Sequence, residues 1–311
     1  MRRAASLLIA AALIAALAVP LLIGGKSTFV ELGNFPAADF LLIITVALAG
    51  WVFRAAKFGC LMHRLNLRVP PWRVGAISLA TEFGFLATPG GVGGYAAGVY
   101  YLRRAGATLS GAGSITAADQ LLDLLFFAAA LPLALFALVE APLPAAVRDV
   151  AAVSAGSVFV AIIVLVGMRR RIGRWLFASD GPLVRIPRLR RHIVALAAFG
   201  ADCDRHLREL ARGGAWFMAA LLACTAGQWM IRYGLLWLIL ERLGHPVPFS
   251  VLLLLQGVVL HAAQWTGLPS GAGGADLGLA ATLVPWISAE HAASALCCGA
   301  SQRSTLALPP D

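Results

Sequence analysis

The stretch Thr88-Pro89-Gly90-Gly91-Val92-Gly93-Gly94 lies inside apolar sequence, and the second half of the chain matches it with Leu268-Pro269-Ser270-Gly271-Ala272-Gly273-Gly274. In both stretches, glycine stands two, four and five residues after the proline. Irregular backbone at membrane depth is tolerated only where it is buried in protein or lines a cavity. Paired interruptions in corresponding halves are typical of transporter binding sites. We therefore predict one site built from both clusters.

The composition indicates a polytopic membrane protein. The 311 residues are 60% hydrophobic and 13% charged, with a mean hydropathy of +0.82, whereas soluble domains carry about 25% charged residues. The net charge of +10 lies in the gaps between apolar runs, as the positive-inside rule predicts, so we expect no nucleic-acid partner. The longest polar stretch, about residues 169–214, is too short for a soluble catalytic domain. The five cysteines show no CxxC spacing, so we expect no disulfide framework, metal or other cofactor.

The apolar runs predict an all-α fold with about five to six full spans. Five of the predicted full spans lie at about residues 4–23, 38–53, 111–138, 150–168 and 215–240. The first run ends near the small-x-small sequence Ala16-Leu17-Ala18, which is typical of signal peptides, but its length favours an uncleaved helix. In the basic segment 169–212, about residues 192–212 could form an interfacial amphipathic helix.

The distribution of positive charges predicts the topology. Residues 54–73 and 169–212 carry five and eleven positive charges, and both segments should be cytoplasmic. The runs 111–138 and 150–168 supply two crossings between them, so residues 74–102 should make no net crossing. Because two full spans need about 40 residues, we predict that this 29-residue segment is a re-entrant helical hairpin tipped by the first cluster.

The same reasoning predicts an inverted repeat. The first repeat comprises residues 1–140 with the hairpin 74–102. The second comprises residues 141–311, with the basic cytoplasmic segment 169–212 and a second hairpin at 249–287. Three crossings in the first half would invert the second hairpin, which suits alternating access. The N-terminus is expected in the cytoplasm.

The glycine clusters predict an anion site. A half-helix beginning after Gly91 or Gly273 would point free N–H groups and a positive dipole into the membrane, which suits a lipid phosphate or carboxylate. Close helix packing is the alternative, because Gly94 and Gly98 form a GxxxG pattern. The candidate residues of the two clusters are Pro89, Gly90, Gly91, Gly93, Gly94, Pro269, Gly271, Gly273 and Gly274.

Ionisable residues in apolar segments complete the candidate site, because charges in lipid are costly and mark functional positions by default. They are Glu82, Asp119, Asp123, Arg232 and Asp276. Asp119 and Asp123 share one helix face at i and i+4. Arg232 could bind a phosphate bidentately, and Glu82 could accept hydrogen bonds from the loop amides. Structural pairing of Arg232 with one of the acids is the alternative.

These pieces resemble the membrane domain of lysylphosphatidylglycerol synthases and its stand-alone relatives. The resemblance covers about residues 54–287. It is carried by residues 87–94 (ATPGGVGG), 102–106 (LRRAG), 118–123 (ADQLLD) and 268–276 (LPSGAGGAD). It implies an integral inner-membrane protein that flips or transports lipids. In the aminoacylating members this domain moves aminoacyl-phosphatidylglycerol, and other relatives are associated with hopanoid or glycolipid pathways.

Departures from the family pattern limit what the resemblance implies. Gly94 and Asp276 stand where Glu is frequent, and Asp119-Gln120 stands where Glu-Arg is common, so the headgroup preference does not transfer. The soluble aminoacyl-transfer domain is absent, so synthase activity is not expected. The family usually continues with another helix after the second hairpin, whereas residues 290–311 hold no such span. We therefore expect a C-terminus that is truncated or frame-altered near Cys297.

The sequence thus favours a lipid flippase or transporter of the bacterial inner membrane, which moves an anionic or modified lipid and is not an enzyme. Two alternatives stay open. One is a non-catalytic membrane partner of a lipid-modifying enzyme in an aminoacyl-lipid, hopanoid or glycolipid pathway. The other is a membrane enzyme acting on lipid headgroups. The expected partners are membrane lipids, such an enzyme and a second copy of the chain.

Overall fold

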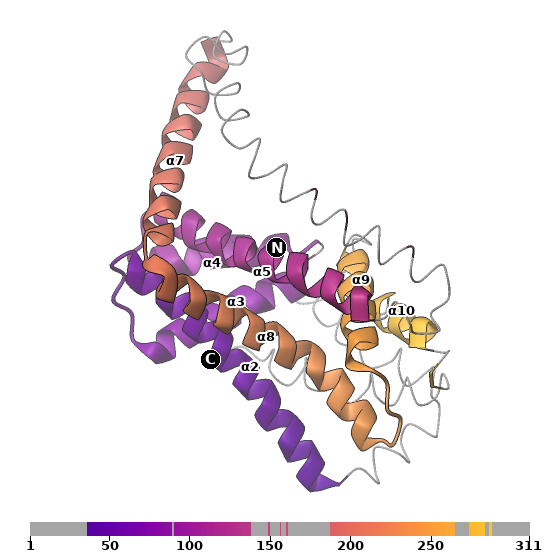
Figure 1. The fold of residues 1–311 in the computed structure, drawn as a ribbon. Coiled ribbons are helices and arrows are strands. Elements are labelled where there is room, and N and C mark those ends of the chain that lie inside the picture. The colour runs from indigo at the N-terminus through magenta and orange to yellow at the C-terminus, as the bar shows by residue number, and fades with distance from the viewer. Residues whose placement is uncertain are drawn as a thin grey trace, which may run out of the picture.

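The computed structural model describes residues 36–88, 90–137, 187–264, 274–283 and 286–287, with the single positions 149, 156 and 160. Within these residues the protein has eight α-helices and no strand (Figure 1). They are α2 (Ala37–Arg64), α3 (Pro71–Ala87), α4 (Val92–Arg104), α5 (Leu109–Ala137), α7 (Pro187–Ala211), α8 (Gly214–Arg242), α9 (Phe249–Gln264) and α10 (Gly274–Leu283). The predicted all-helical fold is confirmed for this part of the chain.

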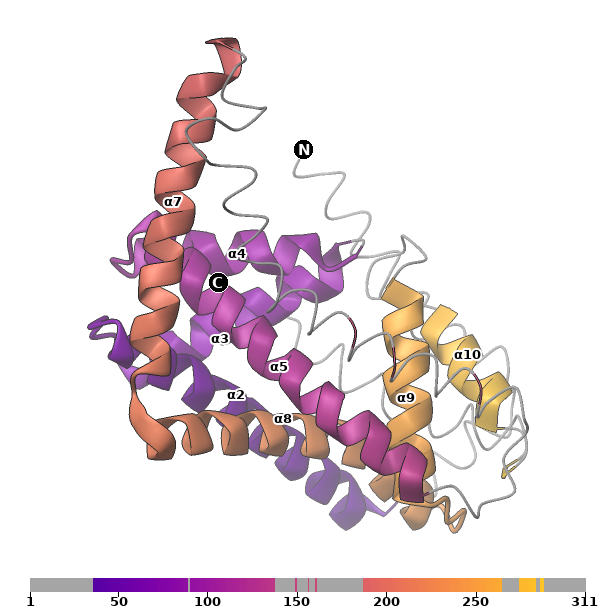
Figure 2. The same cartoon turned by 45° about the horizontal axis from the view of Figure 1, so that its top comes forward.

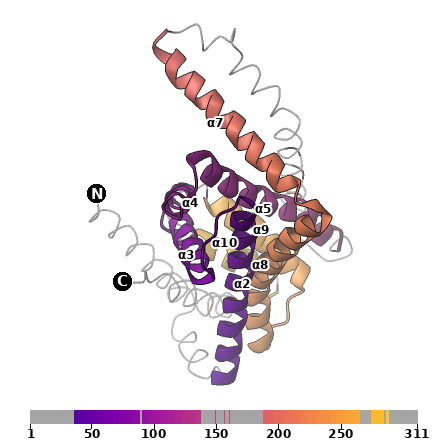
Figure 3. The same ribbon diagram turned by 90° about the vertical axis from the view of Figure 1, so that its left-hand side faces the viewer.

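Three of these helices are long and apolar enough to cross a membrane. They are Ala37–Arg64, Leu109–Phe136 and Gly214–Arg242, which match three of the predicted spans. The predicted spans at 4–23 and 150–168 lie outside the described residues. α2 and α8 pack along each other, and Figures 1 and 3 show them side by side.

Each predicted hairpin region contains a pair of packed helices. α3 and α4 pack closely and are joined by a short turn, so residues 71–104 form a helix-turn-helix where the hairpin 74–102 is predicted. α9 and α10 also pack against each other, while the second glycine cluster between them lies outside the described residues, apart from Gly274 at the start of α10.

Three helices end in the same way, and the sequence explains why. A residue with positive φ follows the C-cap of α2, α4 and α8, namely Asn66 (φ 61°), Gly106 (φ 102°) and Gly244 (φ 79°). The next backbone N–H then donates to a carbonyl in the last turn: Leu67 to Met62, Ala107 to Leu102 and His245 to Leu240. These are Schellman motifs, in which glycine or asparagine adopts the left-handed conformation at low cost.

The end of α2 corrects the predicted span 38–53. Arg54 and Lys57 are predicted to lie in a cytoplasmic basic stretch, but α2 continues through both residues to Arg64. Both side chains are buried, with 4% and 0% exposure. The helix continues because Phe58 and Leu61 extend its apolar face into the core, and because the two cations meet carboxylates. Two of the five positive charges in residues 54–73, on which the topology prediction rests, are therefore buried inside the protein.

α7 projects away from the other helices in all three views (Figures 1, 2 and 3). Its helical conformation confirms the helix predicted at about 192–212, while its position relative to a membrane surface stays a prediction. Phe199 and Cys203 of α7 lie beside Gly113 of α5, where a Cβ atom would lie 3.2 Å from the Phe199 ring. The small residue lets the two helices approach.

Two apolar clusters form the core of the described residues, and a polar layer separates them. The α9 cluster includes Ile43, Phe127, Leu131, Tyr233, Leu236, Leu240, Leu252 and Leu283. The α3 cluster includes Phe58, Leu61, Ile77, Leu102, Ile115, Leu122 and Leu221. Along α2, α5 and α8 the buried charged or polar residues occur at or near the change from one cluster to the other. A polar level therefore interrupts the apolar faces of these long helices.

Candidate functional site

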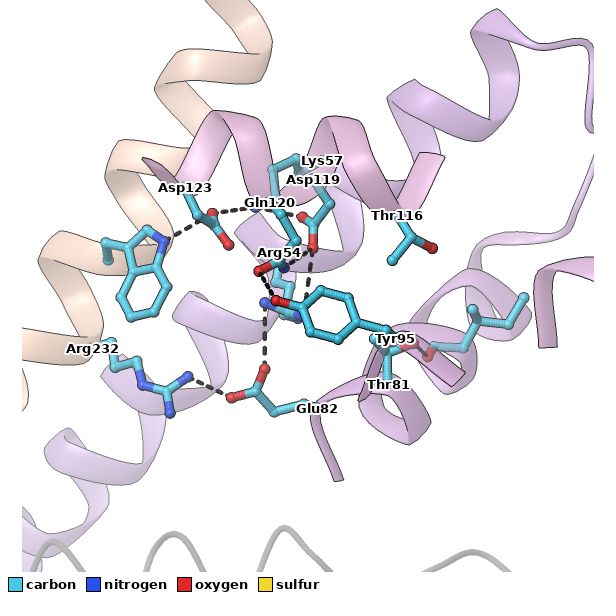
Figure 4. A network of polar contacts seen from close by, with 12 residues as sticks. Arg54, Lys57, Thr81, Glu82, Tyr95, Thr116, Asp119, Gln120, Asp123 and Arg232 are labelled. Atoms are coloured by element: carbon cyan, nitrogen blue, oxygen red, sulfur yellow. Dashed lines mark hydrogen bonds and ion pairs between the residues drawn. The ribbon is translucent and has the colours of Figure 1, made fainter. Parts of the chain in front are cut away.

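Six charged side chains from four helices make up this polar layer, which we call the charge network (Figure 4). They are Arg54 and Lys57 on α2, Glu82 on α3, Asp119 and Asp123 on α5, and Arg232 on α8. Asp123 is the central residue of the 29-residue α5, whereas Arg54 and Lys57 lie in the C-terminal half of α2. The structure thus brings together four residues that the sequence analysis singled out.

Glu82 joins the two arginines. Its Oε1 lies 2.5 Å from Nη1 of Arg232, and its Oε2 lies 3.3 Å from Nη1 of Arg54. Glu82 and Arg54 are buried, whereas the Arg232 side chain is 37% exposed. Arg232 is therefore the member of the network through which the surface is reached.

Lys57 joins the two aspartates. Its fully buried Nζ lies 2.6 Å from Oδ1 of Asp119 and 2.7 Å from Oδ1 of Asp123. One turn of helix separates the two acids, and like charges at this spacing destabilise a helix unless a cation offsets them. Lys57 supplies that cation, so the acidic pair on α5 depends on α2.

Trp229 closes the network into a ring. Its indole N–H donates to Oδ1 of Asp123 over 2.9 Å, and the Arg232 guanidinium lies over its ring at 5.3 Å from the centroid. Arg54 links the two halves on the other side, because its Nη2 lies 3.8 Å from Oδ2 of Asp119. The circuit alternates cations and carboxylates, three of each, and is formally neutral.

Tyr95 connects the ring to the surface. Its side chain is 43% exposed, points from α4 toward the network (Figure 4), and donates through its hydroxyl to Oε1 of Gln120 over 3.2 Å. The Gln120 amide in turn donates to Oδ2 of Asp119 over 3.3 Å. Phe85 packs edge-on against the Tyr95 ring, which fixes the direction of the hydroxyl.

The first glycine cluster forms the turn between α3 and α4, and three of its amides already have partners. The Gly91 N–H donates to the Thr88 carbonyl, the Gly94 N–H to the Gly91 carbonyl, and the Gly93 N–H to Oγ1 of Thr88 over 2.7 Å. The expectation of free amides at these three residues is therefore wrong. Glu82 likewise pairs with arginines where the sequence analysis expected it to accept hydrogen bonds from loop amides.

Close packing explains most of the glycines in this turn. A Cβ atom on Gly84 would lie 2.6 Å from the carbonyl oxygen of Gly93, and one on Gly94 would lie 2.2 Å from the Phe85 ring. Gly90 and Gly91 have positive φ values of 63° and 71°, which glycine adopts most easily. The helix-packing alternative thus accounts for Gly94, and the backbone conformation accounts for Gly90 and Gly91.

The other predicted site residues have different outcomes. Gly90 is exposed at the tip of the turn and is not part of the charge network. Four residues of the two glycine clusters lie outside the described residues: Pro89, Pro269, Gly271 and Gly273. The side chain of Asp276 also lies outside the described part of the structure. Within the described ranges, no three His, Cys, Asp or Glu side chains are grouped so that they could hold a metal ion.

Three members of the ring were missed by sequence reasoning: Arg54, Lys57 and Trp229. A signal for the first two exists, because they are spaced i and i+3 and are followed at helical spacing by Phe58 and Leu61. That pattern indicates that the helix continues past Phe53 with both cations on its buried face. Trp229 carries no such signal, since its partner is 106 residues away.

No functionally curated protein matches the chain. The family model described as the lysylphosphatidylglycerol synthase TM region matches residues 4–301, nearly the whole chain. Together with three membrane-length apolar helices, this match shows that the chain belongs to the lysylphosphatidylglycerol synthase transmembrane family and is a multi-pass membrane protein with a lipid-related role.

Proposed function

We propose that this protein moves an anionic or modified lipid between the leaflets of the bacterial inner membrane, as a transporter and not as an enzyme. The observation that carries the proposal is the charge network within three membrane-length helices and the neighbouring α3. A charged residue at the centre of a membrane helix costs about 2.5–3.5 kcal/mol on insertion scales. Six of them at one level give the middle of the protein a polar interior that a headgroup can enter.

The pairing within the network suits a carrier. Each of Glu82, Lys57 and Asp119 is shared between two opposite charges, so a headgroup that carries charge can replace one partner while the other stays in place. Arg232 is the entry, because it is partly exposed and reaches Glu82 directly. Release follows when Glu82 recaptures the guanidinium. In this scheme the acids of the network couple release of the headgroup to gating.

The proposed architecture places the N-terminus in the cytoplasm, with about five to six full spans and two re-entrant hairpins in an inverted repeat. The packed pairs α3–α4 and α9–α10 support this arrangement, since each occupies a predicted hairpin region. Three exposed arginines, Arg205 and Arg208 on α7 and Arg212 directly after it, would gather anionic lipids at the cytoplasmic surface. A homodimer and a lipid-modifying enzyme partner belong to the same proposal.

A vesicle assay tests this function. The purified protein is reconstituted with a fluorescent phosphatidylglycerol, and the fraction protected from a membrane-impermeant quencher is followed over time. The wild type should move the label, and Glu82→Gln should slow the movement about tenfold or more. The matched control is Asp39→Asn, which breaks the peripheral Asp39–Arg242 pair and should leave transport unchanged. Absence of lipid movement with the wild type, together with a stoichiometric enzyme in the purified material, would favour the partner role.

A further inference from the structure

Arg54 is a buried cation with an unused binding edge. Its Nη1 faces Glu82 at 3.3 Å, whereas Nε and Nη2 have no hydrogen-bond partner among the described residues. The 3.8 Å from Nη2 to Asp119 is an ionic contact that is too long for a hydrogen bond. Nε–H and the neighbouring Nη2–H form the side-on fork of a guanidinium, which fits two oxygens of one carboxylate or phosphate.

Gln228 provides a second unused group at the same level. It is the central residue of the 29-residue α8, is 4% exposed, and neither atom of its carboxamide has a partner in the described structure. The register of α2 and α8 fixes its position. A Cβ on Gly227 would lie 2.9 Å from the Phe53 ring, and one on Gly50 would lie 3.1 Å from Ile231. Gln228 therefore lies beside the Phe53–Arg54 turn of α2.

Ser78 provides a third. Its hydroxyl is buried, with 1% exposure, and has no partner in the part of α3 and its surroundings that the structure describes. It lies one turn before Glu82, which pairs with Arg54, and one turn after Val74, which would lie 3.7 Å from a Cβ on Gly59 of α2. α3 thus brings Ser78 alongside the turn of α2 that follows Arg54.

Buried polar groups nearly always have partners, so three unpartnered groups at one level require an explanation. Their chemistry is mainly that of donors: two N–H groups of Arg54, the Gln228 amide and the Ser78 hydroxyl. We propose that these three side chains, from α2, α8 and α3, bind the oxyanion of a phosphodiester, with Arg54 holding two oxygens side-on. The proposal rests on the proposed function, because it names the headgroup phosphate as the part of the lipid that the protein recognises.

The proposal also separates two roles within the network. Glu82 and Arg232 form the entry, while Arg54 holds its Glu82 contact through Nη1 and can accept the phosphate on its other edge. At Arg54 the phosphate can bind while the contact between Nη1 and Glu82 stays in place. Arginine suits this role better than lysine, because a lysine would carry the same charge but could not present two parallel N–H donors to the phosphate.

Lipid retention by the intact purified protein tests the site. Native mass spectrometry compares phosphatidylglycerol with diacylglycerol, which lacks the phosphate, and a parallel titration uses inorganic phosphate. The variants are Arg54→Lys, Gln228→Met and Ser78→Ala. The first should weaken phosphatidylglycerol binding about tenfold or more, since a charged hydrogen-bond pair is lost, and the other two should weaken it severalfold. Diacylglycerol binding should change in none of them.

Matched controls separate binding from packing. Gln256→Met removes another buried glutamine, whose amide donates to the Tyr233 carbonyl over 3.0 Å, and Arg242→Lys alters the peripheral pair with Asp39. Both should retain phosphatidylglycerol as the wild type does. Tight binding of inorganic phosphate without phosphatidylglycerol would assign the site to free phosphate. If Arg54→Lys fails to fold, Gln228→Met and Ser78→Ala decide, and unchanged retention in both overturns the proposal.

The vesicle assay on the same preparations distinguishes this site from the proposed function. Transport by the wild type with no effect of the three substitutions on lipid retention would reject the phosphate site alone. Retention that depends on Arg54 in a protein that moves no lipid would reject the transport function and keep the site.

Discussion

Arg232 on α8 lies 2.5 Å from a carboxylate oxygen of Glu82 on α3, a residue 150 positions earlier in the chain. The other oxygen of that carboxylate faces Arg54 on α2. One acid therefore joins three helices, two of which are long and apolar enough to span a membrane. The stability of the protein and its proposed activity both depend on this carboxylate.

Glu82→Gln and Arg232→Gln should show strong energetic coupling. Glu82→Gln leaves two arginines near a neutral amide, and loss of one partner of a buried ion pair costs about 3–5 kcal/mol. Arg232→Gln should cost less, because its side chain is partly exposed and Arg54 still neutralises Glu82. The double variant should be more stable than the sum of the single effects by about 1–3 kcal/mol. Thermal unfolding of the four proteins in detergent measures this coupling, and additive effects would contradict it.

Lys57→Met should be among the most damaging single substitutions. It leaves Asp119 and Asp123 as neighbouring buried anions, for an expected loss of about 3–5 kcal/mol. Adding Asp123→Asn should restore part of the stability by removing one uncompensated charge. Arg205→Met is a useful comparison, because it removes an exposed pair with Asp202 and should have little effect. Equal unfolding temperatures for Lys57→Met and Arg205→Met would exclude the proposed role of Lys57.

Gly94→Ala and Gly75→Ala should have opposite effects. A methyl group on Gly94 would overlap the Phe85 ring, whereas one on Gly75 meets nothing within 4 Å. Overpacking of this kind costs about 1–3 kcal/mol, while alanine in an open helix position gains up to about 1 kcal/mol. Thermal unfolding compares the two variants, and Phe85→Ala should rescue Gly94→Ala. A neutral Gly94→Ala variant would show that α3 and α4 do not need this close approach.

Thr88→Val should loosen the start of α4. Oγ1 of Thr88 accepts the Gly93 N–H and donates to the Gly84 carbonyl over 2.8 Å, so it ties the first turn of α4 to the last turn of α3. Loss of such a cap costs about 0.5–2 kcal/mol. Hydrogen–deuterium exchange should become faster in peptides that cover the turn. Thr45→Val, which removes a bond within the exposed face of α2, should leave that exchange unchanged.

The helical spans could be predicted because a continuous apolar run of residues marks each one. Apolar runs long enough to cross a membrane mark α5 and α8, and the pair of breakers at Pro89 and Gly90 marks a turn between two helices. The end of α2 could not be located by hydropathy, because Arg54 and Lys57 lower it where the helix remains buried. Whether a charge ends a span or lies inside it depends on partners far away, and Asp123 is 66 residues from Lys57.

Four charged residues of the charge network could be recognised in the sequence, but the ion pairs between them could not. Glu82, Asp119, Asp123 and Arg232 are recognisable because each interrupts apolar sequence. Their pairing depends on the relative rotation of four helices, which no single segment determines. The same limit explains the error about the first glycine cluster. Only the folded turn shows that Oγ1 of Thr88 accepts the Gly93 N–H and that Gly93 and Gly94 are required by close packing.

The order in which the network's charges leave the ribosome has a consequence for biogenesis. α2 emerges first and carries Arg54 and Lys57, whose acidic partners arrive only with α3 and α5. A helix with two unpaired cations in its buried part partitions less well into lipid than one whose cations are paired. α3 and α5 supply three carboxylates for these two cations, and the six charges of the network balance only when α8 adds Arg232.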